Sequence, residues 1–138
     1  MAVTETLRKQ HAELVEAVRQ IDAALDPKRL AEGAGEIRRL LSGLLGKLSL
    51  HLAMEDNALY PSLEKHGDAK VRDTGSKFAK EMAGVKPAVE AFAKKWSEAE
   101  IVKNAAAFCT ETKKLFAVLA DRIKRENTEL YPLLERGA

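Results

Sequence analysis

Two stretches of the sequence place a carboxylate one helical turn after a residue that either binds a cation or carries a positive charge itself. His51 is followed four residues later by Glu55, and Arg122 is followed four residues later by Glu126. Residues four apart lie on the same face of a helix, so each pair would act together. Imidazole and carboxylate are common ligands of Fe, Zn and Mn, whereas a guanidinium keeps its proton and cannot serve as an ordinary ligand.

The same two stretches are copies of one another. Both end in Leu-Tyr-Pro, and an offset of 71 residues superimposes Glu55 on Glu126. The offset extends over much of the chain, and it brings the helix-capping residue Asp26 onto Ser97. We therefore interpret the chain as two helical hairpins, about 1–68 and 69–138, within a single domain.

The repeat identifies what the second half lacks. His11 and His51 of the first half correspond to Met82 and Arg122 of the second half. Methionine is a soft ligand that suits an oxygen-rich iron site poorly, and arginine places a positive charge where a cation would lie. Of the three equivalent positions in the second half, only Glu126 thus keeps a common metal ligand.

Helices must position these residues. Apolar residues at steps of three, four and seven predict four helices, over about 4–25, 27–65, 69–95 and 97–135. Pro87 is expected to loosen the third helix, and Ser97 with Glu100 forms a capping box for the fourth. Short connections favour antiparallel neighbours, so we predict an all-α, up-down-up-down four-helix bundle.

Polar residues interrupt the apolar stripes of these helices at one level. Unpaired, each would cost several kcal/mol when buried, so they must satisfy one another, a metal or a ligand. The predicted layer, closed on its fourth side by Met82, contains His11, His51, Glu55, Arg122 and Glu126. We expect the Arg122 guanidinium to bridge the two carboxylates without a metal. Tyr60 and Tyr131 are expected to be half-buried, with their hydroxyls at solvent or a carbonyl.

This pattern resembles the hemerythrin-like, or HHE cation-binding, family over nearly the whole chain. Its members are four-helix bundles in which histidines and His-x-x-x-Glu pairs hold a non-haem di-iron centre. That centre handles oxygen, nitric oxide or peroxide, or senses iron or redox state. The positions that match the family's ligands are His11, His51, Glu55 and Glu126. Met82 and Arg122 stand where the family has its other two histidines, so the resemblance implies a degenerate site.

The loss of two histidines from an otherwise intact pattern leads us to expect a regulatory, sensory or protein-interaction module without a cofactor. It would bind a protein partner, as a monomer or homodimer, and no nucleophile constellation indicates an enzyme. The alternative is a protein that senses oxygen, nitric oxide or peroxide, or buffers metal. In that case one Fe, Zn or Mn ion would be held by His11, His51, Glu55 and Glu126.

Composition argues against several other classes. Lys and Arg total 23 against 21 Asp and Glu, and this net charge of +2 gives no reason to expect binding to nucleic acid or membrane. No apolar run approaches the roughly 18 residues of a membrane span, and the N-terminal stretch lacks a signal-peptide pattern. With Cys109 as its single cysteine, the chain cannot form an internal disulfide. We expect a cytoplasmic protein.

Overall fold

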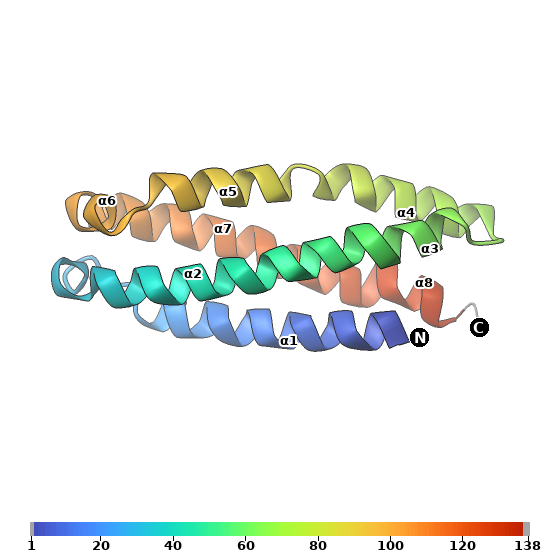
Figure 1. The fold of residues 1–138 in the computed structure, drawn as a ribbon, viewed down its shortest axis with the longest axis horizontal. Coiled ribbons are helices and arrows are strands. Elements are labelled where there is room, and N and C mark those ends of the chain that lie inside the picture. Colours follow the sequence, from blue (N-terminus) through green and yellow to red (C-terminus); the bar gives the residue numbers. More distant parts are fainter. Residues whose placement is uncertain (1, 137–138) are drawn as a thin grey trace.

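The computed structural model describes residues 2–136 and is an all-α, up-down-up-down bundle, as predicted (Figure 1). Four helical columns lie antiparallel along one long axis, and no strand occurs among the described residues. The elements in chain order are α1 (Ala2–Ala23), α2 (Leu30–Met54), the π-helical turn η1 (Glu55–Leu59), α3 (Tyr60–Glu64), α4 (Ala69–Met82), α5 (Val85–Lys95), α6 (Glu98–Lys103), α7 (Ala105–Arg125), the π-helical turn η2 (Glu126–Leu130) and α8 (Tyr131–Glu135). The second column joins α2 to α3, the third joins α4 to α5, and the fourth joins α6 to α8.

The helix ends differ from the predicted ones where capping and proline chemistry intervene. Asp26 caps a turn rather than the helix, because its Oδ1 accepts the N–H of Lys28 at 3.0 Å and α2 begins only at Leu30. The third column breaks at 83–84, before Pro87. Proline at the third position of α5 has no N–H to donate, and its ring crowds the carbonyl four residues earlier. The predicted cap at Ser97 is present, since its Oγ accepts the N–H of Glu100 at 3.2 Å.

Apolar side chains form two separate clusters along the axis. Leu7 and Leu59 belong to the smaller cluster, near the ends of α3 and α8. Leu14 and Leu48 belong to the larger cluster, which fills the rest of the bundle. Buried His11 lies between Leu7 and Leu14 on α1, at the boundary between the two clusters. The buried polar layer therefore separates two apolar cores and is surrounded by packed helices on all four sides.

The two halves share an unusual local conformation at equivalent places. A π-helical turn begins at Glu55 and again at Glu126, so that the N–H groups of Tyr60 and Tyr131 donate to the carbonyls of those glutamates. Five positions along an α-helix correspond to a rotation of about 140° from the first residue, whereas a π turn brings the fifth residue back beneath it. Tyr131 consequently lies on the same face as Glu126.

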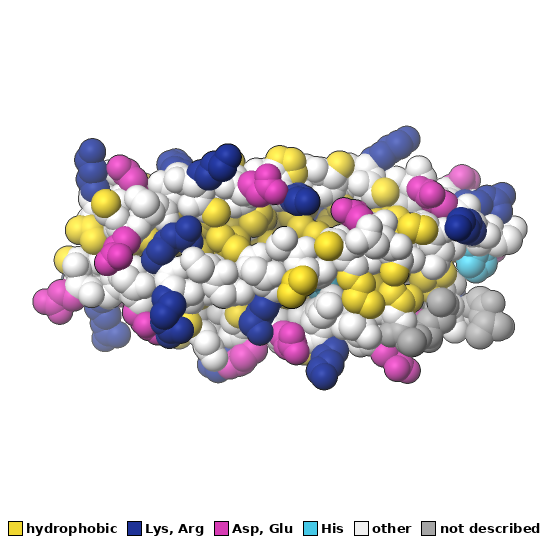
Figure 2. Space-filling view, viewed as in Figure 1, with side chains coloured by type: hydrophobic (Ala, Val, Ile, Leu, Met, Phe, Trp, Pro, Cys, Tyr) yellow, Lys and Arg dark blue, Asp and Glu magenta, His cyan; other side chains and the backbone are white. Residues whose placement is uncertain are grey.

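Charged side chains cover much of the outer surface, and apolar side chains are visible between α2 and α5 (Figure 2). Leu45 and Leu48 of α2 face Val89 and Ala93 of α5 across this furrow. None of the described helices is both long and apolar enough to cross a membrane.

Candidate metal centre

Four ligand-type side chains meet in the polar layer. His11 comes from α1 and His51 from α2, while Glu55 and Glu126 begin the two π turns. All four are at most 2% exposed. One ligand atom from each lies within 4.8 Å of all the others. The structure thus brings together four of the five polar residues that the sequence pattern places in one layer.

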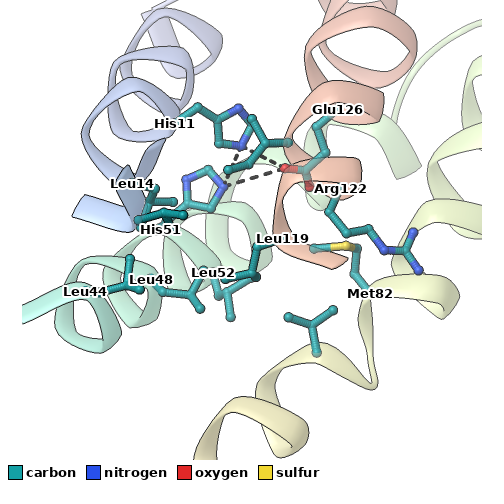
Figure 3. Close-up of a pocket in the computed structure, with 13 residues that line it drawn as sticks. His11, Leu14, Leu44, Leu48, His51, Leu52, Met82, Leu119, Arg122 and Glu126 are labelled. Carbon is teal, nitrogen blue, oxygen red and sulfur yellow. Dashed lines mark hydrogen bonds and ion pairs between the residues drawn. The ribbon is translucent and has the colours of Figure 1, made fainter. Parts of the chain in front are cut away.

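The spacing of these atoms suits a single ion. Nε2 of His11 lies 3.0 Å from Nε2 of His51 and 2.9 Å from Oε1 of Glu126 (Figure 3). Nε2 of His51 lies 3.3 Å from Oε2 of Glu55. Ligand atoms about 2.1 Å from one ion stand roughly 3 to 3.4 Å from one another. The four atoms therefore already lie close to coordination spacing.

Two amide side chains fix the orientation of the imidazoles. Nδ1 of His11 lies 2.8 Å from Oδ1 of Asn127, and Nδ1 of His51 lies 2.9 Å from Oε1 of Gln10. Amide oxygens accept hydrogen bonds, so both Nδ1 atoms carry a proton and both Nε2 lone pairs of the neutral rings face the layer. Two lone pairs 3.0 Å apart repel one another unless a proton or a cation lies between them.

The carboxylates also have spare coordination capacity. Oε1 of Glu55 and Oε2 of Glu126 are buried and have no hydrogen-bond partner among the described residues. A buried carboxylate oxygen without a partner is costly, and a cation is a common way to satisfy it. The donor set of two imidazole nitrogens and two carboxylates therefore fits a divalent ion such as Fe²⁺, Mn²⁺ or Zn²⁺.

Protons compete with a cation for the same atoms. Burial lowers the pKa of His51, but hydrogen bonds to Glu126 and Glu55 outweigh burial and raise this pKa to about 9. Burial raises the pKa of Glu55 to about 7. Burial acts in the same direction on Glu126, yet hydrogen bonds from His11 and His51 bring its pKa down to about 2. Near neutral pH a cation must therefore displace a proton from His51.

Arg122 does not bridge Glu55 and Glu126, so that prediction is wrong. Its guanidinium points away from Glu126 and extends past Met82 (Figure 3). Nη1 lies 2.9 Å from Oε2 of Glu81, and Nη2 donates to the Glu81 carbonyl at 3.2 Å. The Arg122 side chain is 18% exposed there, so the charge keeps some hydration that the buried layer would remove. Glu81 is its ion-pair partner.

Met82 and Arg122 border a small apolar cavity beside the layer. Its volume is about 20 Å³, which is room for roughly one water-sized molecule. His11, His51 and Glu126 line one side of the cavity, and its other walls are mostly aliphatic. The positions of the two missing histidines therefore face this cavity, and the Arg122 guanidinium is paired with Glu81.

Replacing Arg122 by methionine tests the corrected position of its guanidinium. We expect Arg122→Met to lower the melting temperature only slightly, because a partly exposed ion pair contributes little and Glu81 keeps Arg125 as a partner. Cation binding, measured by calorimetric titration, is expected to remain unchanged. A large gain in affinity would instead mean that, in the unmutated chain, the Arg122 guanidinium is paired with the carboxylates of Glu55 and Glu126.

Tyr131 belongs to the site, contrary to the prediction of a half-buried tyrosine. Its side chain is fully buried, and its hydroxyl donates to Oε2 of Glu55 at 2.9 Å. Burial, together with Glu55 and Glu126, raises the pKa of Tyr131 far above its usual range. The five-residue spacing from Glu126 gave no signal, because α-helical periodicity places that position on another face. Gln10 and Asn127 were also missed. Each is the chain neighbour of a ligand residue, His11 or Glu126, and adjacent residues of an α-helix point in different directions.

The chain belongs to a known family. Residues 2–134 match the family model described as Hemerythrin HHE cation binding domain, and this match covers nearly the whole chain. The resemblance inferred from the sequence is confirmed. No curated protein and no solved structure matches the chain. Within this bundle, the buried cluster is the candidate site for a metal ion.

Proposed function

We propose that this bundle binds one divalent cation and acts as a metal-dependent sensory or regulatory domain. The ligands are His11, His51, Glu55 and Glu126. The observation that carries the proposal is the convergence of their ligand atoms within 4.8 Å, with both imidazoles held by amides so that Nε2 faces the layer. This arrangement is pre-organised, because the partners of the ligands are already in place.

A single ion fits this layer better than two. The two missing histidines leave the neighbouring cavity with mostly aliphatic walls, which offer no ligand atoms. The two carboxylates together neutralise one divalent cation, so the loaded site carries no net charge when both imidazoles are neutral. When bound, an iron ion would supply an electrophilic centre for a small ligand such as oxygen, nitric oxide or peroxide.

A sensory role is supported by the energetics of the layer. The cluster buries two carboxylates between two apolar cores, and one oxygen of each has no hydrogen-bond partner among the described residues. A cation that binds only the folded chain stabilises it by about 2.7 kcal/mol at one hundred times its dissociation constant. The stability of the whole bundle would therefore follow the availability of the ion. A partner protein could respond to that change.

The proposal predicts a pH-dependent thermal shift. Because the folded-state pKa of His51 is about 9, the proton on His51 opposes the cation at neutral pH and opposes it less as the pH rises. Glu55, whose pKa is about 7, changes cation binding with pH in the same direction, because its carboxyl group must also lose its proton when the cation binds. The increase in melting temperature on adding Zn²⁺ or Mn²⁺ should therefore grow between about pH 6 and about pH 9.

The experiment compares chelator-treated protein with and without the ion at each pH. In the chelated protein, protonated His51 stabilises the fold fully at pH values below its ordinary pKa of about 6.5. This stabilisation decreases as the pH rises and is lost as the pH passes the folded-state pKa of about 9. That loss makes the shift on adding metal easier to see at high pH. The absence of a shift with Zn²⁺, Mn²⁺ and Fe²⁺ at every pH would contradict the proposed function.

A further inference from the structure

The Tyr131 hydroxyl occupies a position equivalent to that of a ligand atom. Its oxygen lies 2.9 Å from Oε2 of Glu55, 3.1 Å from Nε2 of His11 and 3.4 Å from Oε1 of Glu126. These distances are similar to those between the ligand atoms themselves, such as 2.9 Å between His11 and Glu126 and 3.7 Å between His51 and Glu126. The hydroxyl oxygen is therefore a fifth corner of the same cluster of donors.

The ring of Tyr131 is held in this position by contacts with neighbouring side chains and by the backbone of its own helix. It stacks on the His11 imidazole, with ring centroids 5.2 Å apart and an angle of 19° between the planes. The guanidinium carbon of Arg8 lies 5.5 Å from the ring centroid. The π turn that begins at Glu126 fixes the backbone of Tyr131 beneath that carboxylate. A fully buried ring held in this way has little freedom to move out of the site.

We propose that Tyr131 is a fifth ligand when the site holds Fe³⁺, and that it remains a hydroxyl donor to Glu55 when the site holds a divalent ion. This inference rests on the proposed function, because it requires that the site binds iron. A phenolate is a hard, anionic oxygen ligand and suits a trivalent iron ion. Tyr131 would thereby make the site respond to the oxidation state of its ion.

Charge balance supports the switch between the two roles. Two carboxylates neutralise Fe²⁺, and two carboxylates with one phenolate neutralise Fe³⁺, so the buried site stays uncharged in both states. With ferricyanide as the oxidant, one electron passes from Fe²⁺ to ferricyanide and gives ferrocyanide. The O–H bond of Tyr131 breaks, its proton passes to the buffer, and the phenolate oxygen bonds to Fe³⁺.

Tyr60 provides a matched control within the same chain. It holds the equivalent place in the first half, after the π turn that begins at Glu55. Its side chain is buried, but its hydroxyl has no hydrogen-bond partner among the described residues. The two tyrosines therefore share a sequence context and a backbone conformation, but among the described residues only the Tyr131 hydroxyl hydrogen-bonds to the ligand cluster.

The test uses the full chain loaded with Fe²⁺ without air and then treated with one equivalent of ferricyanide. A ferric phenolate absorbs visible light by charge transfer, so a coloured band is expected in the unmutated chain and in Tyr60→Phe. The band should be lost in Tyr131→Phe, and the Zn²⁺-loaded chain should show none. Resonance Raman of the unmutated ferric chain should show tyrosinate vibrations, a readout that does not depend on folding of the variant.

The outcomes separate this inference from the proposed function. If iron binds but the unmutated ferric chain lacks tyrosinate vibrations, the fifth-ligand role is overturned and the single-ion function stands. The same holds if Tyr131→Phe keeps an unchanged band. If neither Fe²⁺ nor Zn²⁺ binds to the unmutated chain, the proposed function itself fails, and the inference fails with it.

Discussion

Replacing Met82 and Arg122 together by histidine is expected to raise the capacity of the chain from one cation to two. The two positions line the small cavity that adjoins His11, His51 and Glu126. New imidazoles there would add two nitrogen ligands on the side of the layer that lacks them. Oε2 of Glu126 is unpaired among the described residues and is a further donor for the second ion.

A control variant separates the added ligands from the removed charge. Met82→Leu with Arg122→Gln removes the sulfur and the guanidinium but adds no imidazole, so it should still bind one ion. Both double variants release Glu81 from Arg122 and leave it paired with Arg125 at 2.9 Å, so their folds are perturbed alike. Metal titration followed by calorimetry gives the capacity. Equal capacities in the two variants would show that these positions do not face a second cation position.

Replacing His51 by alanine is expected to abolish cation binding and to destabilise the bundle. The variant removes one of two imidazole ligands, and it removes the shared partner of Glu55 and Glu126, which lie 3.3 Å and 3.7 Å from its Nε2. Removing one partner from a buried charged group costs roughly 3–5 kcal/mol, because the remaining charge is left uncompensated. Equilibrium dialysis reports the binding, and urea unfolding reports the free energy.

His66 is the matched control for this substitution. It lies outside the cluster, where its Nδ1 accepts the N–H of Asp68 at 3.0 Å. His66→Ala is expected to keep full binding and nearly full stability. Glu126→Gln keeps the size of the side chain and should also lose binding, so the conclusion does not depend on the fold of His51→Ala. Retention of binding by both cluster variants would place the ion elsewhere.

The sequence was sufficient to predict the four-column bundle and four members of the buried layer, His11, His51, Glu55 and Glu126. Helical periodicity places His11 on the stripe between Leu7 and Leu14, and it places His51 one turn from Glu55. Burial on such a stripe follows from the packing of the helices, whatever the side chain at that position. This is why the polar residues could be located from the pattern of their apolar neighbours.

The directions of long side chains and the local winding of the helix were not predictable in the same way. Periodicity placed Arg122 on the inner face, but its flexible stem carries the guanidinium to the edge of the bundle, where Glu81 lies 2.9 Å away. The π turn brings Tyr131 into the site, and no residue type in the sequence predicts that turn. Both errors concern contacts of the site, and neither changes the fold.

The central claim is that this chain binds a single ion in the buried layer of His11, His51, Glu55 and Glu126. Elemental analysis of the unmutated protein, loaded with Fe²⁺, Mn²⁺ or Zn²⁺ and freed of excess metal, tests it most directly. The predicted result is about one ion per chain for at least one of these metals. A metal content near zero with all three would contradict the claim and favour a metal-free module, and about two ions per chain would indicate an intact dinuclear centre.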